Sequence, residues 1–384
     1  MEEVKMKKLL AILMTVVMLF SLAACSGNGN SENSDNSQEL VRFKIGTIDT
    51  GSTDATSAPL FEQLKLTCEA LGAEYVTAAP TDMTADGYLA AVENLISVGC
   101  KGIIMNAGFV SIPKVAKLCD EAQVYWSLYW YKLEEGTEDY EAAMNSKYFV
   151  STFYEDDTHS AYFATAQLGK QGCKNICMIG LPAGSTSNAR DAGIKQACDE
   201  YGMTVLAEER DFTLTYTAAG GATIAERFLS AYPECDGIII AGMTQFCLPG
   251  VVQTLEQTGN VGKVKVAGID FNEYQFEYME SGALTAIIGG HFTGPTYAAI
   301  LIANIINGTP LTEDKLIFED QFIELDSAET AKKYADYMNG SGGVLYTEEE
   351  IRNCLKKINP DFTIEDLKKI ADSYSVDDLV NRHK

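Results

Sequence analysis

Short apolar segments alternate with amphipathic segments along most of this chain, and this alternation constrains the fold more than any other feature. Residues 43–49 ("FKIGTID") are strand-like, residues 58–72 ("APLFEQLKLTCEALG") have helical spacing, and residues 73–78 ("AEYVTA") are strand-like again. The same order continues to about residue 150, where it starts anew. Strands that alternate with helices predict parallel sheets with helices on both faces. We therefore predict an α/β fold of two similar, Rossmann-like lobes.

The last part of the chain follows a different pattern. From about residue 320 the sequence is acidic and helical, as in "SAETAKKYADYMNG" and "TIEDLKKIADSY". Thr347 and Thr363 are each followed three residues later by an acidic residue, which is typical of a helix start. We predict that residues 321–384 form a helical extension that packs on the lobes or on the connection between them.

The N-terminus has the composition of an export signal. Lysines precede the apolar run "LLAILMTVVMLF", which is followed by the small residues of "SLAAC". The ending "LAAC" resembles the lipobox of bacterial lipoproteins, in which the cysteine is lipidated; an ordinary signal peptide with a chance cysteine is the alternative. We predict a signal peptide over residues 1–24, a lipidated Cys25 that anchors an extracytoplasmic protein to the cell membrane, and a flexible tether over residues 25–40.

The charge of the chain excludes some partners. The formal net charge is −25, and removal of residues 1–24, with three Lys and two Glu, changes it to −26. Such an acidic surface repels nucleic acid and anionic lipid head groups. The ligand is therefore expected to be neutral or cationic, although a local Arg can still bind an anion.

The ten cysteines do not predict a disulfide scaffold. Nine remain once Cys25 is assigned to lipid, and an odd number leaves at least one thiol unpaired. Most lie in apolar stretches, where a thiol behaves as a small hydrophobic group. The C-x3-C pair of "GCKNICMIG" has no matching His/Cys pair, so no metal site is expected.

The residues that follow each predicted strand are candidates for the binding site, because ligands of open α/β sheets bind at the carboxyl ends of the strands. One such stretch is "VYWSLYWYK", residues 124–132, which holds both tryptophans of the chain. Strand alternation places Trp126 in the core beneath a helix. Tyr129 and Trp130 emerge at the carboxyl end of the strand. There they either stack on a ligand or pack the hinge, the connection between the two lobes.

Several loose motifs occur in an order that resembles a known family. They are "LISVGCKGIIM", "ARDAGIKQACDEYGM", "KVAGID" and "GALTAIIGGHFTGPTYAAILIANIINGTPL". Over residues 41–320 the chain resembles the sugar-type substrate-binding proteins of ABC transporters, the ribose/galactose-binding group with the type I periplasmic-binding fold. This resemblance implies a hinge of three crossings that closes on one small molecule. The implied lobes are residues 41–150 plus about 292–320, and residues 151–291.

The resemblance also implies a set of ligand-binding residues. Arg190 and Asp270 match positions that bond sugar hydroxyls, and Asn106 matches an amide that can donate and accept. Phe212 either stacks on the ligand or packs in the core. The full set of predicted ligand-binding residues is Asp49, Thr50, Asn106, Phe109, Tyr129, Trp130, Glu155, Arg190, Phe212, Gln245, Asp270 and His291.

Departures from the family pattern bear on the ligand. Glu155 and Asp156 stand where the family has Asp-Asn, Thr244 and Gln245 replace Asn-Asp, and His291 occupies the position of a Gln. Most importantly, Tyr129 and Trp130 stand where the family has an Asp-Arg pair that binds sugar hydroxyls. The ribose-type pattern is thus only partly retained.

No motif for catalysis or phosphate binding is present, and the three histidines are unclustered. We therefore predict a monomeric solute-binding protein without catalytic residues, cofactor or metal, which delivers a small polar ligand, a sugar in the first place, to an ABC permease. Two alternatives are a receptor for a sensor kinase or chemoreceptor, and a hydrolase that uses Glu155 and Asp156 with Asp270.

Overall fold

Two six-stranded sheets form the framework of the computed structural model, which describes residues 40–51, 53–108, 110–340 and 343–384. In the first sheet the strands lie in the order β11-β5-β4-β3-β1-β2, and all neighbours are parallel. Its strands are β1 (Phe43–Ile48), β2 (Ala73–Ala78), β3 (Gly102–Asn106), β4 (Tyr125–Tyr129), β5 (Phe149–Glu155) and β11 (Leu316–Asp320).

The second sheet repeats this plan with one antiparallel edge. Its order is β12-β10-β9-β8-β6-β7, in which only β12 runs antiparallel to its neighbour β10. Its strands are β6 (Asn175–Ile179), β7 (Thr204–Glu209), β8 (Gly237–Ile240), β9 (Lys265–Ile269), β10 (Ala286–Gly289) and β12 (Ile323–Leu325). Strands β6, β8, β9 and β10 are apolar over most of their length, as expected for strands buried on both faces.

Helices flank both sheets. Those of the first lobe are α2 (Ser57–Ala70), α3 (Ala85–Ser97), α4 (Ile112–Ala122), α5 (Glu138–Asn145) and α12 (Gly294–Ile306). Those of the second lobe are α6 (Asp157–Lys170), α7 (Ser185–Tyr201), α8 (Phe212–Thr215), α9 (Ala218–Ala231), α10 (Thr244–Thr258) and α11 (Gln275–Glu280). The C-terminal helices are α13 (Ala328–Gly340), α14 (Glu348–Asn353), α15 (Ile364–Ser373) and α16 (Val376–Arg382).

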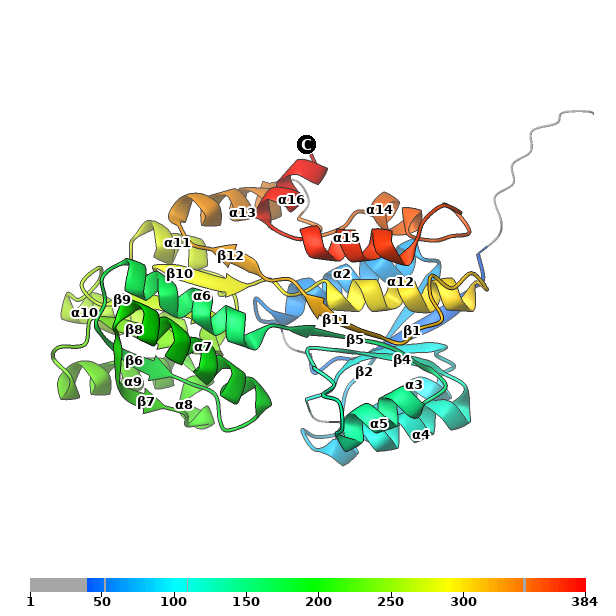
Figure 1. The fold of residues 1–384 in the computed structure, drawn as a ribbon, viewed down its shortest axis with the longest axis horizontal. Coiled ribbons are helices and arrows are strands. Elements are labelled where there is room, and N and C mark those ends of the chain that lie inside the picture. Colours follow the sequence, from blue (N-terminus) through cyan, green and yellow to red (C-terminus); the bar gives the residue numbers. More distant parts are fainter. Residues whose placement is uncertain (1–39, 52, 109, 341–342) are drawn as a thin grey trace, which may run out of the picture. The chain divides into compact units, whose positions relative to one another are not determined.

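The chain passes between the two sheets three times (Figure 1). It leaves the first sheet after β5, returns after β10, and crosses again between β11 and β12. Asp320, at the end of β11, links two of these crossings, because its carboxylate accepts from Thr293 Oγ1 and from the backbone N–H of Gly294, each at 2.8 Å.

The predicted α/β fold of two lobes is confirmed, with two differences at its boundaries. Strand β5 belongs to the first sheet up to Glu155, so this sheet extends five residues beyond the predicted boundary at 150. Strand β12 completes the second sheet, so the first residues of the segment predicted as a helical extension are a strand instead. Alternation cannot reveal a three-residue edge strand, because it is too short to show a period.

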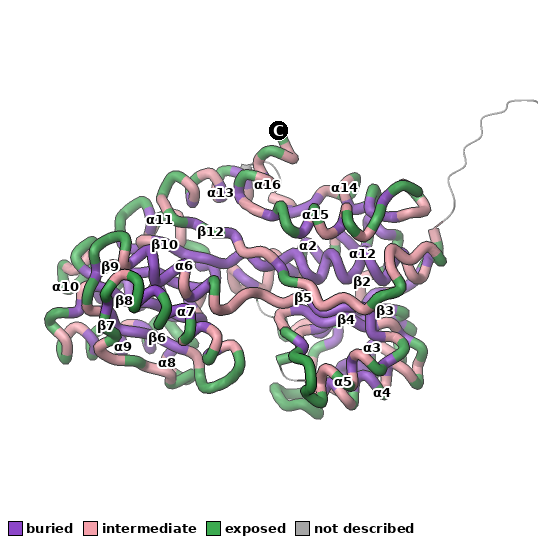
Figure 2. Tube along the Cα trace, viewed as in Figure 1, coloured by how far each residue is buried: buried purple, intermediate pink, exposed green. Residues whose placement is uncertain are grey.

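The C-terminal helices cover a helix that is apolar on all sides. Residues 294–304 of α12 are all buried (Figure 2), and such a helix needs partners all round. One side packs on β3, β4, β5 and α2, and the C-terminal segment covers the other, where Tyr297 and Tyr346 share a hydrogen bond of 2.6 Å. Helix α14 packs against α2, and α13 against α11 and β12, so the extension contacts both lobes.

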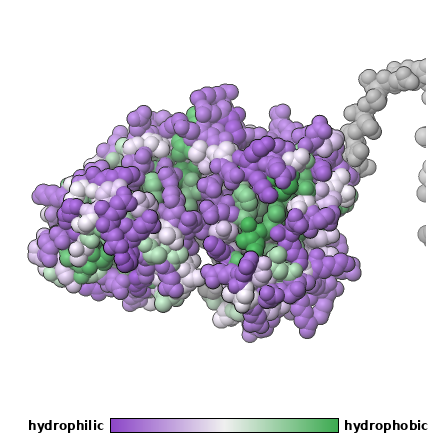
Figure 3. Space-filling model, viewed as in Figure 1, coloured by the Kyte–Doolittle hydropathy of each residue, from purple (hydrophilic) through white to green (hydrophobic). Residues whose placement is uncertain are grey.

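Trp126 and the described cysteines lie in the core, as the sequence predicts. Trp126 is fully buried in β4, where its Nε1 donates to Ser146 Oγ at 3.0 Å and its ring lies 4.6 Å from that of Phe149. The nine described cysteines are all buried and free. The face shown in Figure 3 is largely hydrophilic, in keeping with the acidic composition.

Some predictions fall on residues 1–39 or on Phe109, which lie outside the described residues. These are the signal peptide, the lipidated Cys25, the tether up to residue 39 and one ligand-binding residue. In the described part of the chain, no helix is both long and apolar enough to cross a bilayer.

Candidate ligand-binding site

A cavity of about 350 Å³ is lined by residues from the carboxyl ends of both sheets. From the first lobe, Thr50 follows β1, Asn106 ends β3 and Tyr129 ends β4. From the second lobe, Asp270 follows β9 and His291 follows β10. Nine of the twelve predicted ligand-binding residues line this one cavity: Thr50, Asn106, Tyr129, Trp130, Glu155, Arg190, Gln245, Asp270 and His291.

Arg190 is the centre of a buried ion cluster in this cavity. It lies on α7 and is only 8% exposed. Its Nε donates to Asp157 Oδ1 at 2.8 Å, and its Nη1 donates to the carbonyl of Ala241 at 3.0 Å. The same Nη1 lies 4.0 Å from Asp270 Oδ2. Two of the five N–H donors of this guanidinium are thus bonded to the protein itself, and its charge holds Asp157 and Asp270 at the cavity wall.

The backbone of the cavity wall is strained. The non-glycine residues with positive φ that the structure describes are Gln123, Trp130, Met243 and Asp270, and the last three line the cavity. Their φ angles are 56°, 62° and 78°, in the left-handed region that costs a residue with a Cβ roughly 1–2 kcal/mol. Strain of this kind collects at binding and catalytic sites, where the surrounding structure holds it in place.

Trp130 joins the first lobe to a crossing of the hinge. Its Nε1 donates to the carbonyl of His291 at 2.9 Å, and the two rings lie 5.1 Å apart. The ring of Tyr129 lies edge-on to Trp130 at 5.2 Å, and Phe322 of the third crossing lies 4.9 Å from His291. Tyr129 is buried, whereas Trp130 is half-buried and presents part of its ring to the cavity. Trp130 therefore packs the hinge, and it also lines the cavity, so that stacking on a ligand stays a prediction.

Buried polar atoms without a hydrogen-bond partner gather in the cavity. Of the eight such side-chain atoms among the described residues, four belong to lining residues: Thr56 Oγ1, Glu155 Oε1, Gln245 Oε1 and His291 Nδ1. Leaving a buried polar group unpaired costs about 1–3 kcal/mol. The wall of the cavity therefore holds four buried polar atoms that no protein group satisfies.

The protonation states of the wall follow from its burial. Burial, reinforced by Asp157 and Asp320, raises the pKa of Glu155 well above its usual range. Burial also raises the pKa of Asp270, although Arg190 and the N–H of Met243 oppose the change. Burial, together with the Arg190 guanidinium, lowers the pKa of His291 to about 3, so its imidazole is neutral at physiological pH.

Comparison with known proteins identifies the family. A sequence profile described as periplasmic binding protein domain matches residues 50–309, about two thirds of the chain. The chain belongs to this family. No curated protein sequence matches it significantly.

Solved structures of solute-binding proteins share the fold of this family member. A periplasmic sugar-binding protein from Pseudomonas fluorescens has a TM-score of 0.70 at 13% identity, over 88% of this chain and 99% of that one. An ABC transporter solute-binding protein from Actinobacillus succinogenes with bound D-allose has a TM-score of 0.65 at 18% identity, over 76% and 99%. One from Bacillus halodurans with bound myo-inositol has a TM-score of 0.60 at 19% identity, over 76% and 96%. The match with the Pseudomonas protein covers 88% of this chain, whereas residues 1–327 make up only about 85% of it. This match must therefore include part of the C-terminal helices.

Two predicted ligand-binding residues of this periplasmic binding protein lie outside the lining. Asp49 accepts from the backbone N–H of Gly51 at 2.7 Å and so shapes the turn after β1. Phe212 is 44% exposed, not in the core, and starts a row of rings: it lies 5.0 Å from Tyr216, which stacks on Phe246 at 4.1 Å. The second and third rings of this row line the cavity.

Other lining residues were not predicted from the sequence. Six of them are acidic or aromatic: Asp54, Phe61, Tyr88, Asp157, Tyr216 and Phe246. Asp157 carried a usable signal, because it directly follows the predicted pair at 155 and 156. The aromatic residues carried none, since a ring on a helix has the same spacing whether it faces a core or a cavity.

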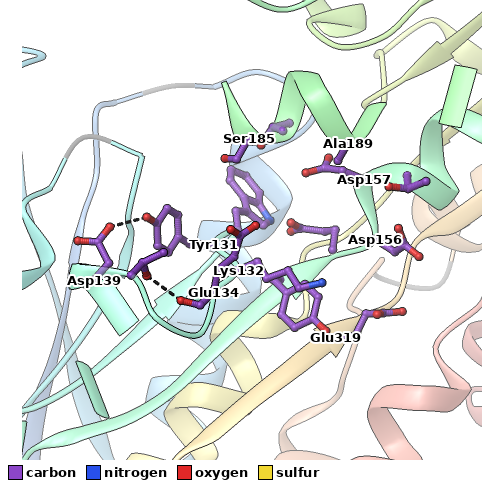
Figure 4. A pocket seen from close by; sticks show the side chains of 15 residues that line it. Tyr131, Lys132, Glu134, Asp139, Asp156, Asp157, Ser185, Ala189 and Glu319 are labelled. Atoms are coloured by element: carbon purple, nitrogen blue, oxygen red, sulfur yellow. Dashed lines mark hydrogen bonds between the residues drawn. The ribbon is translucent and has the colours of Figure 1, made fainter. Parts of the chain in front are cut away.

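A second cavity of about 270 Å³, whose lining side chains are drawn in Figure 4, shares four lining residues with the first. Trp130, Glu155, Asp157 and Thr186 line both cavities and form the wall between them, which we call the shared wall. In Figure 4, Asp139 and Glu134 lie on one side of the second cavity, and Asp156 and Asp157 on the other. Among the described residues, no group of three or more His, Cys, Asp or Glu side chains is arranged to hold a metal ion.

Proposed function

We propose that this chain is an extracytoplasmic receptor that captures a small sugar or polyol in the cavity between its lobes and delivers it to an ABC permease. The observation that carries the proposal is that four unpartnered buried polar atoms, from Thr56, Glu155, Gln245 and His291, belong to residues that line one cavity at the carboxyl ends of both sheets. The bound D-allose and myo-inositol of two structural neighbours support a polyhydroxylated ligand.

The chemistry of the lining suits such a ligand. Sugar hydroxyls both donate and accept, so they match carboxylate, amide and hydroxyl groups at the same time. The C–H faces of a sugar ring suit the rings of Trp130, Tyr216 and Phe246. Binding without chemical change is proposed, because the structural neighbours are solute-binding proteins.

Closure of the hinge would complete the site. The lining comes from both lobes, and Trp130 already bonds to the carbonyl of His291 on a crossing. A ligand that bonds both lobes stabilises the closed arrangement by its differential affinity for that state. The closed form is the one that we propose docks on the permease.

Isothermal titration tests the proposed ligand class. D-allose, D-glucose, D-galactose and myo-inositol are titrated into the wild type, into Asp270→Asn and into Asp49→Asn. We expect saturable binding of at least one compound, at least tenfold weaker binding by Asp270→Asn, and unchanged affinity for Asp49→Asn. The two aspartates are a matched pair, because each follows a strand but only Asp270 lines the cavity. Absence of heat with every compound would refute the ligand class.

The anchor and the partner are proposed from the N-terminal sequence and from the family. Incorporation of labelled palmitate into the wild type and its loss in Cys25→Ala would support anchoring through Cys25. Vesicles that contain a candidate permease should show ligand uptake only when the loaded receptor is added. Uptake that does not depend on the receptor would contradict delivery.

A further inference from the structure

Carboxylates outnumber cations in the lining of the two adjoining cavities. Glu155, Asp157 and Asp270 line the first cavity, where Arg190 is the one permanently cationic side chain among the described lining residues. The second cavity adds further carboxylates and, in the part that the structure describes, a single cation. These carboxylates are Glu134, Asp139, Asp156 and Glu319, and the cation is Lys132.

Both cations are already engaged. Arg190 bonds Asp157 at 2.8 Å and the carbonyl of Ala241 at 3.0 Å. The ammonium of Lys132 lies 4.8 Å from the centre of the Tyr154 ring. Neither Arg190 nor Lys132 forms a hydrogen bond with Glu155, and Oε1 of Glu155 is buried without a partner. An ionised carboxylate that is withdrawn from water without a cation is strongly unfavourable. Glu155 therefore holds a proton when no cation is beside it, in line with its raised pKa, and a ligand cation at this carboxyl group would take the place of that proton.

The neutral groups of the wall cannot supply a positive charge beside Glu155. His291 is 6% exposed and lines the first cavity with its Nδ1 unpartnered, but its burial keeps the imidazole neutral. Oε1 of Gln245, and Oε1 of Glu155 once Glu155 is ionised, can only accept hydrogen bonds, and neither has a partner in the protein. The half-buried ring of Trp130 lies in the same wall as Glu155, and an aromatic face attracts a cation.

We infer that the ligand carries an ammonium group, as an amino sugar or aminocyclitol does, and that this group binds at the shared wall between Glu155 and Trp130. The inference rests on the proposed function and narrows its ligand class. The ammonium donates to the Glu155 carboxylate, while the hydroxyls of the ring bond the first cavity. A hydrogen bond to a charged group contributes about tenfold to hundredfold in affinity.

Titration of paired compounds tests the inference. D-glucosamine is compared with D-glucose and with N-acetyl-D-glucosamine, D-galactosamine with D-galactose, and putrescine serves as an amine that is not a sugar. We expect at least one amino sugar to bind about tenfold or more tightly than its neutral partner, and N-acetylation to remove the advantage. Glu155→Gln should reduce the preference to less than about threefold. Glu93→Gln, an exposed acid on α3 outside both cavities, should retain it.

The outcomes separate this inference from the proposed function. Neutral sugars that bind as tightly as their amino partners would overturn the ammonium group and leave the sugar ligand intact. Binding of putrescine alone would support the cation site and refute the sugar. Absence of binding by every compound would refute both. If Glu155→Gln did not fold, the wild-type comparison of amine with neutral sugar would still decide.

Discussion

Removal of the Arg190 guanidinium should destabilise the whole protein, and not only its binding site. In Arg190→Ala, Asp157 loses a hydrogen bond of 2.8 Å and Asp270 loses a cation at 4.0 Å, and both stay largely buried. Breaking a buried ion pair by removal of one partner costs about 3–5 kcal/mol. We therefore expect the free energy of unfolding to fall by about 3 kcal/mol or more. The double variant Arg190→Ala/Asp157→Ala should lose less than the sum of the two single changes, because they share one interaction.

Urea unfolding followed by circular dichroism measures this effect, with a shift of the midpoint at constant slope. Lys195→Ala is the matched control on the same helix. Lys195 pairs with Asp199 at 2.5 Å, but both side chains are largely exposed, and such a pair contributes less than about 1 kcal/mol. A loss below about 1 kcal/mol in Arg190→Ala, or equal losses in the two variants, would refute the idea that Arg190 stabilises the protein by neutralising Asp157 and Asp270.

Three further predictions concern the scaffold. Burial would raise the pKa of Glu350, but hydrogen bonds from Thr347, His383 and Arg382 hold it at about 2. The ionised carboxylate therefore contributes about 2–3 kcal/mol to the free energy of unfolding. This contribution is complete above pH 4.5 and is lost as the pH falls toward 2. The difference in free energy of unfolding between the wild type and Glu350→Gln should therefore shrink over that range; a constant difference would argue against it. Gly250→Ala should destabilise by about 2 kcal/mol or more in the same assay, because its Cβ would lie 1.7 Å from the carbonyl oxygen of Ala218; a neutral result would mean that α9 and α10 separate freely. Gln123→Gly, at a helix end with φ of 56°, should raise the thermal midpoint through about 0.5–1 kcal/mol of relieved strain, and a lower midpoint would contradict this reasoning.

The fold and much of the site were accessible from the sequence for definite physical reasons. The alternation of strands and helices determines the sheet direction, and the carboxyl ends of parallel strands meet at one edge. Asn106, Trp130 and Asp270 could therefore be placed near one another before any coordinates were known. Strand alternation also separated Trp126, which is core, from Trp130, which lines the cavity.

What the sequence did not reveal depends on tertiary contacts. The role of Arg190 as a partner of Asp157 requires the relative placement of α7 and α6, which no local pattern encodes. Asp49 and Asp270 both follow strands, yet only one side chain lines the cavity, because the other bonds its own turn. The cover that the C-terminal helices give α12 is likewise a property of packing, although the apolar length of α12 already required a partner.

The binding of a ligand beside Trp130 is tested most directly by tryptophan fluorescence. The chain has two tryptophans, of which Trp126 is fully buried in the core and Trp130 lines both cavities. D-allose, D-galactose, D-glucosamine and myo-inositol are titrated into the wild type and into Trp130→Phe. We predict a saturable change in emission in the wild type at the concentration where heat is observed, and no change in Trp130→Phe. Heat of binding without any change in wild-type emission, or an equal change in Trp130→Phe, would contradict a ligand site at the shared wall.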